Sequence, residues 1–129
     1  MPVVRNHMSR DLLSVEPGET ITSVAQRMVE RNLGAVLVID EDRLAGIMTE
    51  RDLMRAVARG LHVEGIVADY MTKNPETIEP DDTIEHAGVL MIHGGFRHLP
   101  VVDGDDIVGI LSIRDLVRVA IEDTAPRGV

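Results

Sequence analysis

Two short segments of the chain place a hydroxyl and a carboxylate three residues apart, directly after an apolar run. One holds Thr49 and Asp52, and the other holds Ser112 and Asp115. A hydroxyl that precedes a helix accepts a hydrogen bond from the amide three residues on, and an acid in the first turn interacts favourably with the positive end of the helix. Helix capping alone would therefore explain both pairs.

The same pairs also suit the binding of a nucleoside phosphate. Free amides and a hydroxyl at a helix N-terminus form a phosphate site, and a carboxylate accepts hydrogen bonds from the two hydroxyls of a ribose. Arg97 and His98 lead into the apolar segments that end at Ser112. They would neutralise the phosphate, since a charge pair at 4 Å is worth roughly 4 kcal/mol at an effective dielectric of 20. An exposed Arg97 without a ligand is an equally good interpretation, so capping and nucleotide binding both stay open.

Both pairs belong to one internal repeat. Residues 8–58 align with residues 71–121 without a gap, and identical pairs such as Gly46 and Gly109 recur along the alignment. A match of this length indicates a duplicated structural unit.

Hydrophobic spacing predicts the same elements in each copy. Apolar residues at helical spacing predict a first amphipathic helix over residues 21–29 and again over residues 84–92. Apolar runs separated by an acidic turn predict hairpins, and a second helix follows the hydroxyl of each pair. The predicted hairpins join 35–39 to 44–49 and 99–102 to 107–112, and short strands precede the first helices at 13–15 and 76–78.

Each copy is therefore expected to fold as β-α-β-β-α, in the α/β (α+β) class. The strands are nearly continuous apolar sequence, so they need cover on both faces. We expect two pseudo-symmetric repeats, residues 8–61 and 69–124, packed sheet to sheet as one module with two equivalent clefts at their junction. Residues 60–65 are the predicted linker.

Composition narrows the choice of partners. The chain has 129 residues, a formal net charge of −9 and 2% aromatic residues, which argues against attraction to nucleic acid or to an anionic membrane. It has no cysteine and no secretory h-region, and no apolar run approaches the roughly 20 residues that cross a bilayer. We expect a cytoplasmic protein that binds neither nucleic acid nor membrane.

The repeated Gly-Ile-x-Thr/Ser-x-x-Asp pattern, the stretch 99–103 and the Met71-Thr72 start together resemble a pair of cystathionine-β-synthase (CBS) domains, also called a Bateman module. The resemblance covers about residues 8–122, and the recurrence of the motif in register makes it specific. It implies a regulatory adenosyl ligand such as AMP, ADP or ATP, bound in clefts between the two domains, with no required cofactor. It also implies a homodimer.

The resemblance assigns residues of this chain to the two clefts. The first would hold adenine, ribose and phosphate through Thr20, Ile21, Ala25, Gly34, Ala35, Arg97, His98, Ile110, Ser112 and Asp115. The second would use Ile47, Thr49, Asp52, Thr83 and Ile84. The first repeat has Gly34-Ala35 where the second has Arg97-His98, so the second cleft lacks a basic pair. We expect it to bind weakly or to stay empty.

Three kinds of function fit these residues. The leading one is a regulatory sensor without catalytic activity, which a partner protein or a change of oligomer reads out because no effector domain is fused to it. A ligand-free dimerisation scaffold would use the two pairs as caps only. A small nucleotide-acting enzyme is disfavoured because the sequence shows no positioned base and no carboxylate cluster for magnesium. No metal site is expected, since His86 and His93 lack an acidic third ligand.

Overall fold

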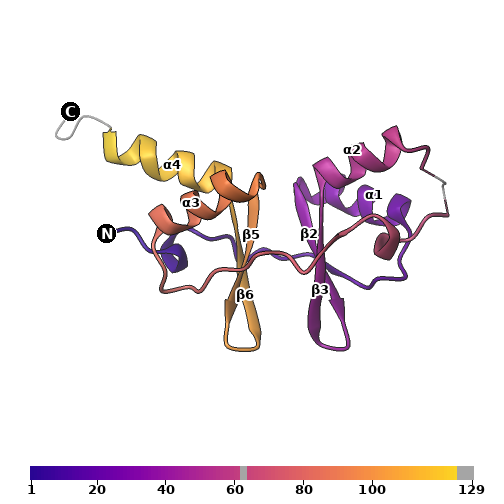
Figure 1. The fold of residues 1–129 in the computed structure, drawn as a ribbon, viewed down its shortest axis with the longest axis horizontal. Coiled ribbons are helices and arrows are strands. Elements are labelled where there is room, and N and C mark those ends of the chain that lie inside the picture. The colour runs from indigo at the N-terminus through magenta and orange to yellow at the C-terminus, as the bar shows by residue number, and fades with distance from the viewer. Residues whose placement is uncertain (62–63, 125–129) are drawn as a thin grey trace. The chain divides into compact units, whose positions relative to one another are not determined.

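The computed structural model describes residues 1–61 and 64–124 (Figure 1). Its contacts divide the chain into two units: unit 1 holds Met1–Asp11 and the chain from Glu76 onward, and unit 2 holds Leu12–Pro75. The chain therefore passes between the units after Asp11 and after Pro75. The predicted linker at residues 60–65 falls within unit 2 by this division, with residues 62 and 63 outside the described part, and it stays a prediction.

Unit 2 is built around a four-stranded sheet with the strand order β1-β2-β3-β4. β2 and β3 form an antiparallel hairpin, β1 runs parallel to β2, and β4 runs antiparallel to β3. Figure 1 shows α1 and α2 at the end of this hairpin that lies away from its turn. The elements are β1 (Ser14–Val15), α1 (Ile21–Arg31), β2 (Ala35–Asp40), β3 (Arg43–Thr49), α2 (Glu50–Ala58), a 3-10 turn (Val67–Asp69) and β4 (Thr72–Lys73).

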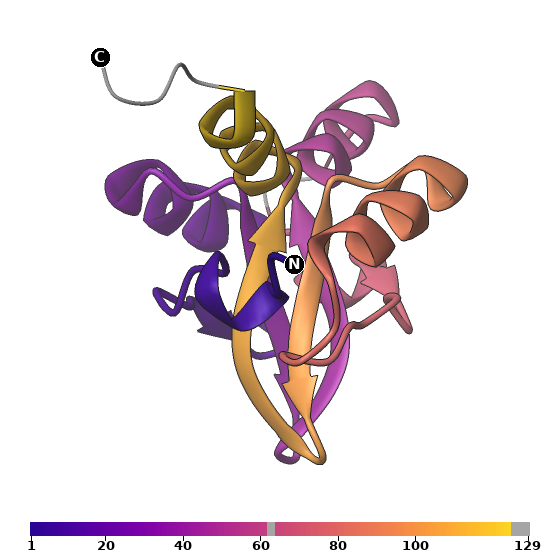
Figure 2. The same cartoon turned by 90° about the vertical axis from the view of Figure 1, so that its left-hand side faces the viewer.

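Unit 1 repeats this arrangement with shorter flanking strands. β5 and β6 form the hairpin, and α3 and α4 lie at the end opposite its turn in both views (Figures 1 and 2). Single bridges join Ile78 to Val101 and Ser9 to Ile110, at the positions that β1 and β4 occupy in unit 2. The strand predicted at residues 76–78 is thus reduced to one bridge. The elements are a 3-10 turn (Val4–Asn6), α3 (Ile84–Gly94), β5 (His98–Asp103), β6 (Asp106–Ser112) and α4 (Ile113–Thr124).

Local signals explain where the first helix of each unit begins and ends. Thr20 and Thr83 cap α1 and α3, since each hydroxyl accepts a hydrogen bond from the amide three residues on. The helices end at Asn32 (φ 53°) and Gly95 (φ 72°), both in the left-handed conformation that Asn and Gly tolerate best. Gly95 and Asn32 therefore end these two helices in the same way.

Each unit has its own hydrophobic core. The unit 2 core contains Val15, Ile21, Val24, Met28, Val36, Val38, Met48 and Val67. The unit 1 core contains Val4, Ile78, Ile84, Ala87, Met91, Leu99, Val101, Leu111 and Val119. Several of these residues occupy equivalent positions in the two copies, so the duplicated sequence builds a duplicated core.

The second helix of each unit forms where it is predicted, but part of its apolar sequence faces outward. Met54 and Val57 in α2 are each 68% exposed, and Val117 in α4 is exposed as well. The buried side chains of α2 are Asp52 and Ala56 instead. The first-turn aspartate is therefore turned inward, toward the hydroxyl that precedes it.

Among the described residues, no helix is long and apolar enough to span a membrane.

Candidate functional site

Asp52 is held in a capping box at the start of α2. Its Oδ2 accepts hydrogen bonds from the Thr49 amide at 2.9 Å and the Thr49 hydroxyl at 3.0 Å, and the Asp52 amide donates to Thr49 Oγ1 at 3.2 Å. The side chain is only 6% exposed. The predicted cap is therefore present, and it already uses one oxygen of the carboxylate.

The other oxygen of Asp52 is bound from a distant part of the chain. The Thr72 hydroxyl, on β4, donates to Asp52 Oδ1 at 3.0 Å. Arg55, one turn further along α2, is 3.9 Å from the same oxygen and 57% exposed. The neutral Thr72 hydroxyl thus binds Oδ1, the outer oxygen of Asp52, and Arg55 lies at about the longest distance at which an ion pair is counted.

Asp115 repeats the cap at the start of α4. Its Oδ2 accepts from the Ser112 amide at 2.8 Å and from the Ser112 hydroxyl at 3.0 Å, and the Asp115 amide donates to Ser112 Oγ at 3.3 Å. The Asp115 side chain is 12% exposed. Capping geometry is therefore shared by the two copies.

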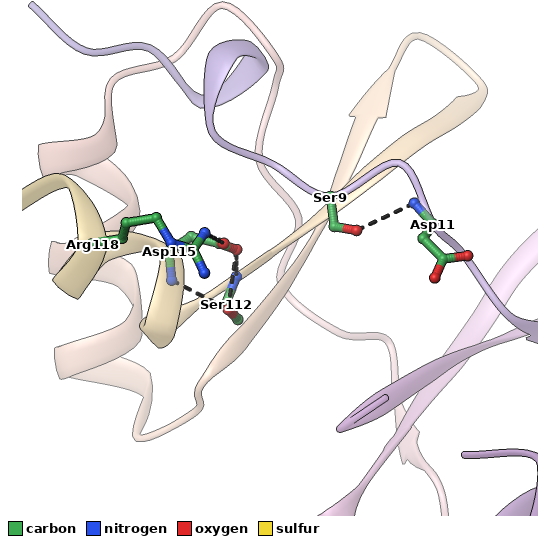
Figure 3. A network of polar contacts seen from close by, with 5 residues as sticks. All are labelled: Ser9, Asp11, Ser112, Asp115 and Arg118. Carbon is green, nitrogen blue, oxygen red and sulfur yellow. Dashed lines mark hydrogen bonds and ion pairs between the residues drawn. The ribbon is translucent and has the colours of Figure 1, made fainter. Parts of the chain in front are cut away.

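The outer oxygen of Asp115 has a different partner. Arg118 donates to Oδ1 at 3.1 Å, and its side chain is 59% exposed. Ser9 stands at the position equivalent to Thr72, but its hydroxyl accepts from the Asp11 amide at 3.2 Å. Figure 3 shows the Arg118 side chain against Asp115, with Ser9 lying apart and turned to Asp11. An exposed arginine holds the position that a strand hydroxyl holds in unit 2.

This geometry changes what the carboxylates can offer to a ribose. A carboxylate has about two acceptor positions on each oxygen, and both positions on Oδ2 are filled by the hydroxyl residue of the cap in either unit. Only Oδ1 remains for a ligand. The contact between the carboxylate and a ribose stays a prediction, and in these capped side chains it would fall on Oδ1.

The amides at the start of α4 are also largely occupied. The Ile113 amide donates to the Arg97 carbonyl at 2.8 Å, and the Ser112 and Asp115 amides donate within the cap. Three of the amides on which the expected phosphate site would draw are thus hydrogen-bonded within unit 1. The same contact brings the Arg97 backbone to the start of α4, and the Arg97 side chain is exposed, so a phosphate at this end would depend on that cation.

Glycines in the repeated motif admit the neighbouring segment that carries Thr72 or Ser9. A Cβ built on Gly46 would lie 2.7 Å from both Met71 Sδ and the Thr72 carbonyl oxygen, and one on Gly109 would lie 2.5 Å from Met8 Sδ and 2.9 Å from the Ser9 carbonyl oxygen. Any side chain would push this segment away from the hairpin. The motif glycine is therefore required for close approach of two backbones.

The remaining predicted residues divide between the units. His98 pairs with Ser112 across the β5–β6 hairpin, and the Gly34 carbonyl accepts from the amide that begins α2. Thr20 precedes α1 and Gly34 follows its end, and the helix spans about 16 Å. Unit 1 contains Thr83, Ile84, Arg97, His98, Ile110, Ser112 and Asp115, and unit 2 contains Thr20, Ile21, Ala25, Gly34, Ala35, Ile47, Thr49 and Asp52. Each predicted cleft thus draws on both units and stays a prediction.

No group of three or more metal-binding side chains occurs among the described residues. His86 instead contacts Asp82, with Nδ1 2.6 Å from Oδ2. The hydrogen bond from His86 lowers the pKa of the Asp82 carboxyl. This pair links the first turn of α3 to the residue before its cap, which is a structural role.

The fold and the repeated cap define a duplicated α/β module. The CBS domain family model matches residues 4–59 and 67–122. The chain belongs to this family and forms a tandem CBS pair, or Bateman module.

Relatives with known sequences carry the same module. The chain is 40% identical over 110 residues to an uncharacterised 17.7 kDa protein of Acidianus ambivalens. The aligned part is 84% of this chain and 66% of that protein. The chain is 32% identical over 117 residues to the CBS domain-containing protein YhcV of Bacillus subtilis. The aligned part is 90% of this chain and 84% of that protein. The chain thus spans slightly less than two thirds of the first of these relatives.

Solved structures share the fold. The CBS-domain containing protein ATU1752 from Agrobacterium tumefaciens superposes with a TM-score of 0.87 at 34% identity, over 92% of this chain and 99% of that one. CBSX2, solved in complex with AMP, superposes with a TM-score of 0.81 at 26% identity. The match covers 97% of this chain and 100% of that one. The CBS domain pair of MJ0100 was solved in complex with 5′-methylthioadenosine and S-adenosyl-L-methionine. It superposes with a TM-score of 0.85 at 25% identity, and the match covers 92% of this chain and 98% of that one.

Sequence reasoning missed Thr72, Ser9, Arg55 and Arg118 as neighbours of the two aspartates. The repeat alignment contains their signal, because Ser9 aligns with Thr72 and Arg55 with Arg118. Spacing also points to the arginines, since residues three apart on a helix are neighbours. The choice of partner at Oδ1 depends on side-chain geometry and is absent from the alignment.

Proposed function

We propose that this chain is a regulatory module that binds an adenine nucleotide and has no catalytic activity of its own. The observation that carries the proposal is the Asp115 carboxylate, which is nearly buried, fixed by its cap, and bound at its outer oxygen by an exposed arginine. Two relatives of similar fold were solved with AMP or with S-adenosyl-L-methionine. A preorganised carboxylate suits the ribose hydroxyls that these ligands share.

The proposed phosphate contact is Arg97, with His98 beside it. Arg97 is exposed, and its carbonyl is tied to the first amide of α4, so its backbone is fixed while its side chain is free to reorient. A cation recognises a phosphate and gains nothing from a sulfonium. We therefore propose AMP, ADP or ATP as the ligand in preference to S-adenosylmethionine, with the adenine contacts as the family resemblance assigns them.

The test is calorimetric titration of nucleotide-stripped protein with AMP, ADP, ATP and S-adenosylmethionine, using the wild type, Arg97→Ala and the exposed control Arg10→Ala. Saturable binding of the phosphates, weakened about tenfold or more in Arg97→Ala and unchanged in Arg10→Ala, is the expected result. Equal loss of all four ligands in Arg97→Ala would contradict a phosphate contact. If no adenosyl compound binds, the ligand-free scaffold takes the place of the sensor.

An enzymatic role is the weaker alternative. The described residues near Asp115 offer one carboxylate, whose two oxygens are already engaged by Ser112 and Arg118, so it is not free to accept a proton from a nucleophile. We expect no release of inorganic phosphate from ATP or ADP incubated with the protein. Release that purifies with the chain and is lost in Asp115→Ala would support the enzyme.

We also propose that the chain forms a homodimer in the cytoplasm. A protein partner would respond to a change in the arrangement of its helices. The support is a set of outward-facing apolar side chains on helices of both units: Val29, Met54, Val57, Val89, Ile92, Ile113, Val117 and Ile121. Three of them recur every fourth residue along α4 and form one stripe, which a second copy would cover.

Light scattering coupled to gel filtration tests the dimer. We expect the wild type to elute as a dimer and Val117→Asp or Met54→Asp to shift it toward the monomer, with Arg59→Asp as the exposed polar control. A wild type that is monomeric across the accessible concentrations would remove this part of the proposal.

A further inference from the structure

We propose that Arg118 occupies the ribose position on Asp115 and is exchanged for the ligand, whereas Thr72 keeps the equivalent position on Asp52 partly closed. This inference rests on the proposed function and names the residues that decide which carboxylate binds ribose. It makes Arg118 a positioning residue that competes with the ligand.

The first support is the exposure of Arg118 itself. Its guanidinium donates to Asp115 Oδ1 at 3.1 Å while 59% of the side chain is exposed. Only the arginine end of this ion pair is solvated, since Asp115 is 12% exposed; screening of the guanidinium and the ordering of a long side chain weaken the pair. A ligand can therefore displace Arg118 at small cost, and the released guanidinium returns to solvent.

The second support is the contrast with unit 2. Arg55 aligns with Arg118 but lies 3.9 Å from Asp52 Oδ1, and the Thr72 hydroxyl binds that oxygen at 3.0 Å. Thr72 is held by β4, whose backbone pairs with β3. The Thr72 hydroxyl can leave Oδ1 only by rotation about one restricted bond of a β-branched side chain, whereas Arg118 can leave by rotation about any of several bonds along its longer side chain.

The acceptor positions on Oδ1 then set the selectivity. The outer oxygen of each aspartate can accept about two hydrogen bonds. One of these is already donated, by Thr72 in unit 2 and by Arg118 in unit 1. A ribose cis-diol donates two hydrogen bonds, so it needs both positions and must displace the existing donor. At Asp115 the donor leaves readily, and at Asp52 it does not. A 2′-deoxyribose has one hydroxyl to donate and fits the open position without any exchange.

Uncharged nucleosides isolate this effect from phosphate binding. The experiment is calorimetric titration of the full chain with adenosine and 2′-deoxyadenosine, for the wild type, Arg118→Ala and the matched control Arg55→Ala. Because an ion pair with an exposed arginine is worth up to about 1 kcal/mol, we expect adenosine to bind Arg118→Ala up to about fivefold more tightly than the wild type. Binding of 2′-deoxyadenosine should not change, and Arg55→Ala should leave both affinities as they are. Thermal unfolding of each variant verifies that it is folded.

Three results would overturn the inference while leaving the proposed function intact. Weaker adenosine binding in Arg118→Ala would make the arginine a ligand contact, and unchanged binding would mean that it does not compete. An equal gain for both nucleosides would point to a general effect of charge. If the wild type binds neither nucleosides nor adenine nucleotides, the proposed function fails, and the inference fails with it.

Discussion

The surroundings of Asp52 and Asp115 differ by one contact that comes from outside the repeated motif. Both aspartates are capped by the preceding hydroxyl residue, at nearly the same distances. The outer oxygen is bound by Thr72 in one unit and by Arg118 in the other. Duplicated sequence thus builds two equal scaffolds, and the segment beside each hairpin decides how available the carboxylate is.

The largest expected effect concerns the glycine that admits this segment. Gly46→Ala should lower the free energy of unfolding by about 2–3 kcal/mol, because the new Cβ meets a strand carbonyl at 2.7 Å. Gly109→Ala should cost about 1–2 kcal/mol, since its closest neighbour is the flexible end of Met8.

Urea denaturation measures both costs. Gly18→Ala is the control, because nothing lies within 4 Å of its Cβ position, and it should change the stability by less than about 0.5 kcal/mol. An equal loss of unfolding free energy at Gly46 and Gly109 would mean that the segments around Thr72 and Ser9 resist displacement from their hairpins to the same extent.

The helix ends provide the next comparison. Gly95→Ala should destabilise by about 1 kcal/mol, because alanine must adopt the left-handed φ of 72°. Asn32→Gly, at the equivalent end of α1, should stabilise by a few tenths of a kcal/mol, since glycine adopts this conformation more readily than asparagine. Thermal or urea unfolding decides the signs, and a stabilising Gly95→Ala would contradict the assigned cap.

The third comparison removes the two hydroxyls of the flanking segments. Thr72→Val deletes the hydrogen bond to Asp52 and should cost about 1 kcal/mol. Ser9→Ala deletes only an exposed contact with the Asp11 amide and should cost less than about 0.5 kcal/mol. Urea midpoints measured on both variants give the difference, and a larger cost at Ser9 would show that this serine has a role beyond the local turn.

The smallest effect is a pH dependence that belongs to unit 1. His86 lowers the pKa of Asp82 below its ordinary value of 3.8. The pair therefore stabilises the fold fully above the unfolded-state pKa, and this contribution is lost as the pH falls through the folded-state value. In His86→Ser, which copies Ser23 of unit 2, the pKa of Asp82 should rise toward 3.8. Carboxyl chemical shifts followed by NMR would detect the change, and an unaltered Asp82 titration would exclude the histidine as its cause.

The sequence predicted the helices and hairpins well because their signals are local. Helical spacing of apolar residues, threonine caps and acidic turns all act within a few residues, and α1, α3 and the two hairpins form where they were expected. The outward face of α2 was missed because apolar spacing alone does not say which side a helix buries. Asp52, a polar residue, faces inward there because Thr49 and Thr72 satisfy its carboxylate.

The candidate site was predicted only in part, for a related reason. Thr49 and Asp52 are three residues apart, and so are Ser112 and Asp115, and local geometry is enough to pair them. Thr72 is 20 residues from Asp52 in the chain and reaches it only through the pairing of β4 with β3. Whether a flanking hydroxyl turns to the carboxylate or to its own backbone depends on competing local hydrogen bonds, which spacing does not encode.

The most direct test of the account is calorimetric titration of AMP into Asp115→Ala and Asp52→Ala alongside the wild type. The account predicts one site per chain whose affinity falls about tenfold or more in Asp115→Ala, since a hydrogen bond to a charged group is worth about 1.5–3 kcal/mol. The same site should remain within about threefold of the wild type in Asp52→Ala, because the Thr72 hydroxyl already takes one acceptor position on the outer oxygen of Asp52. Loss of binding in Asp52→Ala with retention in Asp115→Ala would contradict the assignment of the open carboxylate.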